Sequence, residues 1–284
     1  MIDLILDVCL DAIIDTAKLL PFLYLTYLAM EYLEHKLTVK SLTAIQRAGN
    51  FGPLIGGALG AVPQCGFSAA ASGLYAGKII SLGTLIAIYL STSDEMLPIM
   101  ISSKAPIGFI LSIIGLKLLI GVIWGFLIDK VFFRNEKAHE HINIHGMCEK
   151  DHCNCDKGIW TSDLKHTLSI AGFILIVSLI LGFTLEFMGE DTLVGLFLNH
   201  KILGPLSASL IGLIPNCAAS VVITELYLEG AIGFGSLMAG LLSGAGVGWL
   251  VFLRASKDIK KTLKVIVILF ITGALSGIVI GLFK

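Results

Sequence analysis

The chain has 284 residues, of which 56% are hydrophobic and 14% are charged, and its formal net charge is −1. Soluble domains carry about 25% charged residues, so this composition is typical of an integral membrane protein in contact with the lipid bilayer. The near-neutral charge gives no reason to expect a nucleic acid as a partner.

Six apolar stretches are long enough to cross about 30 Å of hydrocarbon. They cover residues 10–34, 79–101, 106–132, 166–188, 231–253 and 262–283. Two weaker regions, 50–77 and 202–229, have apolar arms of about a dozen residues, which reach only about 18 Å as helices. Each of these regions is interpreted as a helical hairpin, made either of two short spans or of a re-entrant pair. The chain then has five helical elements in each half and ten in all.

The two predicted hairpins are copies of each other at an offset of 152 positions, and positions 52–91 hold 15 identities in 40 with the second copy. Each hairpin is split by a proline, an amide and a cysteine. The aligned residues are Pro63 with Pro215, Gln64 with Asn216, and Cys65 with Cys217. Because apolar bias alone does not align such a triplet, the chain is interpreted as a duplicated unit.

Lysine and arginine gather in three stretches, namely residues 35–50, the central linker and residues 254–264. Five elements per repeat put all three stretches on one side of the membrane, which the positive-inside rule makes cytoplasmic, with the N-terminus outside. An odd number of elements also inverts the second copy, and inverted repeats with interrupted helices are typical of secondary transporters. The predicted fold is an all-α integral membrane protein with two inverted-topology repeats. Repeat 1 covers 1–132, the cytoplasmic linker 133–164 and repeat 2 165–284.

The triplets supply the first candidate ligands for an ion pathway. Pro63 and Pro215 break the helical hydrogen-bond ladder and so free carbonyl oxygens. The neighbouring residues add amide and hydroxyl oxygens and soft sulfur ligands. These candidates are Gln64, Cys65 and Ser68 in the first copy, and Asn216, Cys217 and Ser220 in the second. The alternative is that each triplet is a hairpin turn with a small packed cysteine.

Buried acids supply the second set of candidates. Asp94 and Glu95 follow Thr92 within an otherwise apolar segment. A carboxylate at membrane depth costs about 2.5–3.5 kcal/mol, so a functional use is the default expectation. The alternative is that the helix ends at Leu90 and the acids reach the extracellular surface. Glu225 lies in the second arm of the second hairpin, and for it the alternative is a place at the outer interface.

The central linker holds seven nitrogen or sulfur ligands within 17 residues. They are His139, His141, His145, Cys148, His152, Cys153 and Cys155. This composition suits zinc-like or thiophilic ions at tetrahedral sites. Because the spacing matches no fixed zinc-finger pattern, we expect a flexible chelating loop that senses or collects metal. A generic polar linker is the alternative.

Two further patterns favour a structural interpretation. Lys117 is the one cation deep in a predicted span, and it is expected to reach toward a partner. Glycines at four-residue spacing are expected to let helices approach closely. They are Gly121 and Gly125, Gly273 and Gly277, and Gly240, Gly244 and Gly248.

These features together resemble the ten-transmembrane heavy-metal exporters, which are often labelled manganese transporters and are distantly related to the arsenic permeases. The resemblance covers nearly the whole chain. Its most specific parts are the segments around Pro63–Cys65, Asp94–Glu95 and Pro215–Cys217. It implies metal efflux across a bacterial or archaeal inner membrane.

The predicted function is therefore secondary-active export of a heavy or transition metal, with an Mn²⁺-like divalent cation favoured over arsenite, an organoarsenical or another thiophilic ion. No nucleotide-binding motif occurs, so export would couple to an ion gradient. We expect no catalysis and no cofactor besides the transported ion and a linker-bound divalent metal; a homo-oligomer is left open.

Two other classes of protein compete with a transporter. An intramembrane lipid-pyrophosphate phosphatase needs cations on its phosphates, and no arginine occurs between Arg47 and Arg134 or between Arg134 and Arg254. A metal-sensing scaffold would explain the linker but not the acids.

Overall fold

The computed structural model describes residues 51–61, 65–92, 96–132, 202–256 and 258–283, together with a few helical residues between 10 and 25 and between 168 and 180. Within these ranges the regular secondary structure is helical and contains no strand, as an all-α fold requires. Within the described residues, four segments are long and apolar enough to cross a membrane. They are Leu82–Ser102, which runs through residues 93–95 outside the described ranges, Ile107–Val131, Phe234–Ser256 and Ile259–Phe283. These four confirm four of the predicted spans, whereas 10–34 and 166–188 lie mostly outside the described residues.

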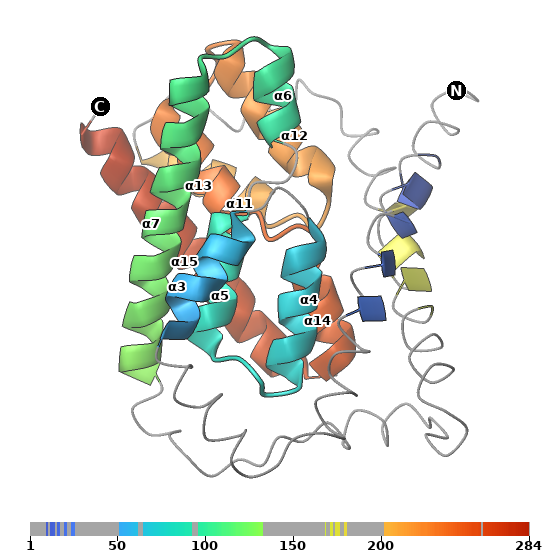
Figure 1. Ribbon diagram of the computed structural model, residues 1–284. Coiled ribbons are helices and arrows are strands. Elements are labelled where there is room, and N and C mark those ends of the chain that lie inside the picture. Colours follow the sequence, from blue (N-terminus) through green and yellow to red (C-terminus); the bar gives the residue numbers. More distant parts are fainter. Residues whose placement is uncertain are drawn as a thin grey trace, which may run out of the picture.

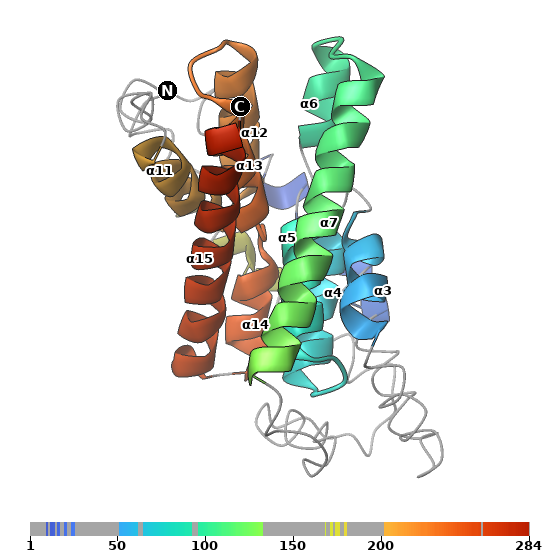
Figure 2. The ribbon, with the colours of Figure 1, turned by 90° about the vertical axis from the view of Figure 1, so that its left-hand side faces the viewer.

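Each predicted hairpin consists of two short helices. The first contains α3 (Gly52–Gly60) and α4 (Cys65–Ala76), and the second contains α11 (Leu203–Gly212) and α12 (Cys217–Leu228). Both hairpins are divided at their triplets, as predicted. In Figure 1, α3 and α4 occupy the lower half of the molecule, and Figure 2 shows α11 and α12 in the upper half. Each hairpin therefore enters and returns at one end of the molecule, and the two enter from opposite ends, which favours the re-entrant alternative.

Two of these four spans are broken helices, and the sequence anticipates a helix end only in the first, in the alternative that ends it at Leu90. The first consists of α5 (Leu82–Ser91) and α6 (Met96–Ser102), and the second of α13 (Phe234–Ser243) and α14 (Gly248–Ser256). In the second copy the break follows Gly244 and contains Gly246, which has a left-handed φ of 52°. A glycine adopts this conformation without steric cost, so the helix stops although the segment stays apolar.

The broken helices form the centre of the molecule, and two long helices lie outside them. Every residue of α5 is buried, as is nearly every residue of α13. The outer helices are α7 (Ile107–Phe132) and α15 (Ile259–Phe283), which pack against α5 and α13 respectively and expose many large apolar side chains. Such an apolar outer surface suits contact with lipid. Figure 2 shows α7 descending and α15 ascending.

The helix bounds repeat at the same offset as the sequence. Adding 152 to the bounds of α4 and α5 gives those of α12 and α13. The packing between copies is reciprocal, because α4 lies against α14 and α12 lies against α6. Two aromatic contacts between the copies also involve equivalent tyrosines: Tyr75 lies 5.1 Å from Phe252 and Tyr227 lies 5.9 Å from Phe109, between ring centroids. These features, together with the opposite directions of α7 and α15, favour the inverted repeat. The inverted relation between the two complete copies stays a prediction.

Small residues hold the outer helices close to the broken ones. A Cβ atom added to Gly121 of α7 would lie 2.9 Å from Ala87 O of α5, and one added to Gly273 of α15 would lie 3.1 Å from Ala239 O of α13. These contacts are equivalent in the two copies and support the packing interpretation of the glycine pattern.

The ends of the helices agree with the predicted distribution of basic segments. The start of α3, the end of α7 and the junction of α14 with α15 all lie at the lower end of the molecule in Figure 1. These are the three places that adjoin the lysine- and arginine-rich segments. The cytoplasmic side, the extracellular N-terminus and the domain bounds stay predictions.

Candidate functional site

A small pocket with a few polar groups in a mostly apolar lining lies where both helix breaks meet the tip of the second hairpin. The α5–α6 break contributes Thr92 and Met96, and α7 contributes Lys117. The second copy contributes Asn216 and Ser220 from its hairpin, and Leu241, Gly244 and Gly246 from α13 and its break. The pocket volume of about 20 Å³ is enough for one water molecule or one small ion.

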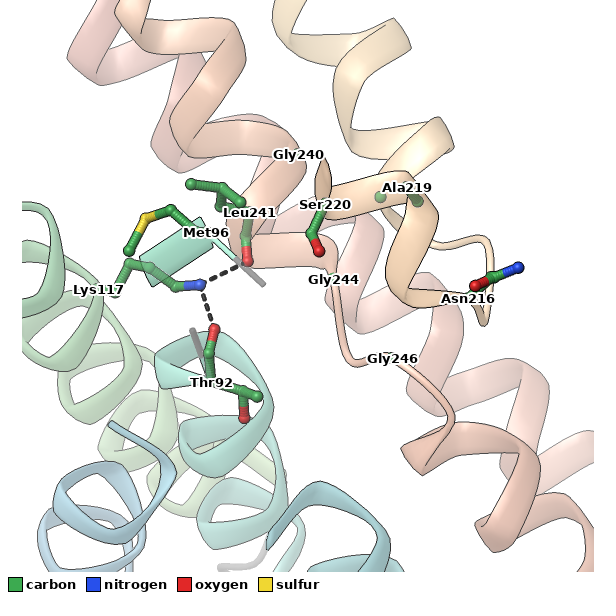
Figure 3. Close-up of a pocket in the computed structure, with 11 residues that line it drawn as sticks. Thr92, Met96, Lys117, Asn216, Ala219, Ser220, Gly240, Leu241, Gly244 and Gly246 are labelled. Carbon is green, nitrogen blue, oxygen red and sulfur yellow. Dashed lines mark hydrogen bonds between the residues drawn. The ribbon is translucent and has the colours of Figure 1, made fainter. Parts of the chain in front are cut away.

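Lys117 joins the two copies across this pocket. Its side chain is 1% exposed, and its Nζ atom donates to Leu241 O at 2.8 Å and to Thr92 O (Figure 3). A buried ammonium needs such acceptors because burial removes its hydration. The sequence predicts that Lys117 reaches toward a partner, and the structure identifies backbone carbonyls of both copies as two of its partners.

Helix breaks explain why these carbonyls can accept from a side chain. In an uninterrupted helix, Leu241 O would accept from the N–H of Ala245. The break at Gly244 changes this pattern, because Ala245 N donates to Ser243 O at 2.9 Å. Leu241 O is thereby left for Lys117. Thr92 is the residue that caps the C-terminus of α5, with an extended ψ of 132°, so its carbonyl also lies past the helical ladder.

The second triplet forms the turn that the sequence predicts. Pro215 is buried between α11 and α12, and Asn216 N donates to Ile214 O at 2.8 Å. Leu213 O, beyond the last turn of α11, accepts from Trp249 Nε1 at 3.1 Å. The turn therefore frees a carbonyl, which the indole of α14 satisfies. The Asn216 amide points away from the other labelled side chains in Figure 3, so its backbone borders the pocket more closely than its amide oxygen.

The equivalent region of the first copy is filled by a hydrogen-bonded cluster. Ser72 Oγ lies 2.6 Å from Ser68 O, 2.7 Å from Gly248 O and 2.6 Å from Tyr89 Oη. Ser68 and Tyr89 are both fully buried. Tyr89 aligns with the pocket residue Leu241, so the phenol occupies space at a position where the second copy carries a shorter side chain. The two copies thus have the same arrangement of short helices but carry different polar groups between them.

Asp129 does not pair with Lys117, although both belong to α7. Its Oδ1 accepts from Gly83 N at 2.8 Å and its Oδ2 accepts from Ser81 Oγ at 2.6 Å. The carboxylate therefore lies at the N-terminus of α5, where the positive end of the helix dipole favours it. Asp129 acts as a helix cap.

The structure brings some of the predicted site residues to the pocket and not others. Thr92, Asn216 and Ser220 line it. Ser68 belongs to the equivalent cluster of the first copy. Glu225 has an exposed side chain on α12 and does not line the pocket. Cys65 and Cys217 begin α4 and α12, but their side chains lie outside the described residues.

The remaining predicted residues fall outside the ranges that the structure describes. They are Pro63, Gln64, Asp94, Glu95 and the linker ligands His139, His141, His145, Cys148, His152, Cys153 and Cys155. In the described ranges no group of three histidine, cysteine or acidic residues could hold a metal ion. Asp94 and Glu95 are bracketed in the sequence by two pocket residues, Thr92 and Met96.

Sequence reasoning missed the contribution of the glycines and of Lys117 to this site. Gly240 and Gly244, whose spacing predicts close packing, also line the pocket. A lone lysine inside an apolar span was the available signal for Lys117. It indicates a buried cation but not which of the surrounding elements provides its acceptors.

Four apolar spans in the described ranges, two of them broken, together with two hairpins of short helices define a multi-pass integral membrane protein. The model of the family described as "Putative, 10TM heavy-metal exporter" matches residues 1–196 and 168–284, which together cover the chain. The chain belongs to this family, as the resemblance predicted. No curated protein and no solved structure matched it in the corresponding comparisons.

Proposed function

We propose that this protein is a secondary-active transporter that exports a divalent transition-metal ion, Mn²⁺ or one of similar hardness, from the cytoplasm. The family description supports the coarser function of heavy-metal export. The single observation that carries the finer proposal is the pocket between the two helix breaks. Broken helices near the middle of an integral membrane protein are where secondary transporters bind their ions, since freed carbonyls and helix ends face the cavity.

The size of the pocket supports an ion as the cargo. A volume of about 20 Å³ holds one water-sized ligand, whereas sites for organic molecules occupy roughly 300–1,000 Å³. In this conformation an ion would enter without its hydration shell. The oxygen atoms of the protein would then replace the water ligands.

The donors that line the pocket favour a hard or borderline ion over a metalloid. Thr92 and Ser220 carry hydroxyl groups, and Leu241 contributes its carbonyl oxygen. Among the pocket-lining residues, Met96 carries the one sulfur atom. Oxygen donors suit Mn²⁺, and thiolates suit trivalent arsenic. The cysteines Cys65 and Cys217 keep the thiophilic-ion permease as the alternative substrate class.

The carboxylates Asp94 and Glu95 are proposed to supply negative charge for the ion and to carry protons in exchange. For Glu225, a role in the ion pathway is proposed on the basis of the sequence alone. Its exposed side chain on α12 gives that role no structural support. The linker ligands are proposed to collect metal on the cytoplasmic side. We propose a bacterial or archaeal inner membrane as the location, and nothing in the family description supports the phosphatase alternative.

Reconstitution into liposomes that contain a metal-sensitive dye tests this function. We expect a protein-dependent signal for Mn²⁺ under an imposed proton gradient, and a smaller one for arsenite measured by inductively coupled plasma mass spectrometry. Absence of flux for Mn²⁺, Fe²⁺, Co²⁺, Zn²⁺ and arsenite under every gradient would contradict transport. A larger arsenite flux would favour the thiophilic-ion alternative.

A pair of serine variants on the second hairpin tests the location of the site. Ser220→Leu fills the pocket and removes one of its hydroxyl groups, so it should lower the transport rate about tenfold or more, which corresponds to about 1.4 kcal/mol or more in the barrier. Ser207→Leu is the matched control, because Ser207 lies on α11 with its hydroxyl bonded locally to Leu203 O. Equal rates for the two folded variants, checked by size-exclusion chromatography, would place the site elsewhere. Asp94→Asn should abolish coupling to the proton gradient.

A further inference from the structure

Lys117 places a cation of the protein itself in the pocket between the two helix breaks. Its ammonium is almost completely buried, and it donates to Thr92 O from the first copy and to Leu241 O from the second. Lys117 itself belongs to α7 of the first copy. Its bond to Leu241 therefore crosses between the copies.

The two acceptors lie at equivalent structural features. Thr92 follows the last residue of α5, and Leu241 belongs to the last turn of α13, which ends at Ser243. The C-terminal end of a helix carries a partial negative charge from its unpaired carbonyl groups. Two such ends therefore face one ammonium. This arrangement attracts a small cation whether or not the cation is attached to the chain.

We propose that Thr92 O and Leu241 O form a binding site for a small primary ammonium ion, and that Lys117 is its tethered occupant. The tethered ammonium connects the two copies across the pocket through its hydrogen bonds to Thr92 O and Leu241 O. Both acceptors are neutral backbone carbonyl groups. The proposal does not depend on which ion the protein exports.

The position of the Lys117 ammonium affects the binding of any other cation that enters the pocket. A second positive charge beside Lys117 is repelled by its ammonium and competes for the same oxygen atoms. Binding of a cationic cargo would thus favour release of Lys117 from Thr92 or Leu241. Release would loosen the contact between α7 and α13 that this side chain provides.

Chemical rescue of Lys117→Ala tests the site. The substitution removes the end of the side chain with its ammonium, and ethylammonium is small enough to enter the space left behind. We expect the purified full-length variant to lose at least about 5 °C in Tm, because the acceptors lose a buried charged partner. Ethylammonium should restore about 3 °C or more in a saturable manner, by binding the folded state.

Three controls isolate the effect of the ammonium. Tetramethylammonium has the same charge but no N–H donor, and n-propanol has a similar length but no charge, so neither should rescue. Lys130→Ala removes an exposed lysine from the same helix and should not respond to ethylammonium. A folded Lys117→Ala protein that ethylammonium does not stabilise beyond the Lys130→Ala protein would overturn the proposal.

A second pair of variants covers the case in which Lys117→Ala does not fold. Lys117→Arg keeps a cationic donor, and Lys117→Met keeps an apolar chain of similar length. The proposal expects the arginine variant to have the higher Tm, whereas a purely packing role expects the methionine variant to be at least as stable. Rescue by ethylammonium without metal flux in liposomes would support the ammonium site and contradict the export proposal. Metal flux without rescue would support export and contradict the ammonium site.

Discussion

The hydrogen bond from Trp124 Nε1 to Ser276 Oγ, 2.9 Å long, joins two residues that occupy equivalent positions in the two copies, 152 residues apart. Trp124 belongs to α7 and Ser276 belongs to α15, and these helices run in opposite directions (Figure 2). When two elements are related by a two-fold axis, equivalent residues contact each other only beside that axis. The predicted axis of the inverted repeat therefore passes between Trp124 and Ser276.

This contact predicts an energetic coupling between the copies. Trp124→Phe and Ser276→Ala should each lower the free energy of unfolding by about 0.5–1.5 kcal/mol, because each removes one partner of a partly buried hydrogen bond. The double variant should cost less than the sum of the two single variants. Thermal unfolding of the purified protein measures all three values. Strict additivity would show that the bond does not couple the copies.

The glycines of the outer helices make a second prediction about stability. Gly121→Ala and Gly273→Ala should each destabilise the protein by about 1–3 kcal/mol, since the new methyl group would lie about as close as 3 Å to a carbonyl oxygen of the adjacent broken helix. The effect should be larger at Gly273, because a Cβ atom there would also lie 2.1 Å from Ser243 Oγ, whereas no atom lies closer than 2.9 Å at Gly121. Thermal unfolding again provides the measurement.

Gly115 is the matched control on α7. A Cβ atom at this position would meet nothing within 4 Å, so Gly115→Ala should be neutral or should stabilise the protein by up to about 1 kcal/mol through helix propensity. A Gly121→Ala variant as stable as Gly115→Ala would disprove close packing of α7 on α5.

The buried cluster of the first copy gives a third prediction. A serine hydroxyl has one proton, so Ser72 donates to one of its two carbonyl acceptors, Ser68 O or Gly248 O, and accepts from Tyr89. Ser72→Ala leaves the buried Tyr89 hydroxyl without this acceptor and should cost about 1–3 kcal/mol. Tyr89→Phe removes only the donor and should cost about 0.5–1.5 kcal/mol.

The order of these two effects is the test, and it is read from the free energies of unfolding. Ser207→Ala is the control, since Ser207 is half-buried and its hydroxyl bonds only within its own helix, to Leu203 O or Gly204 O; it should stay within about 0.5 kcal/mol of the parent protein. A larger loss for Tyr89→Phe than for Ser72→Ala would contradict the assignment of Ser72 as the acceptor for the Tyr89 hydroxyl.

Much of the architecture follows from local features of the sequence. Apolar runs give the positions of the long helices, because only helices satisfy their backbone groups inside a bilayer. Pro215 separates α11 from α12, because proline cannot continue the hydrogen-bond ladder. The offset between Cys65 and Cys217 predicts the matching bounds of α4 and α12.

The breaks in the central helices do not follow from the same features. The segment from Leu82 to Ser102 is apolar enough to be one span, yet α5 ends at Ser91. Gly246 is the residue that permits the left-handed turn in the second copy. Glycines at four-residue spacing fit close packing as well as a break, so the pattern alone does not distinguish the two.

The sequence by itself determined the class of protein, the hairpins and the internal duplication, because each depends on short-range hydrophobicity, proline chemistry or residue identity. Only the tertiary structure decided that Lys117 meets Thr92 and Leu241, which lie 25 and 124 residues away along the chain. That meeting requires α7, α5 and α13 to pack in one particular register. The register is set by the sum of many side-chain contacts between the helices, and no single segment of the sequence encodes it.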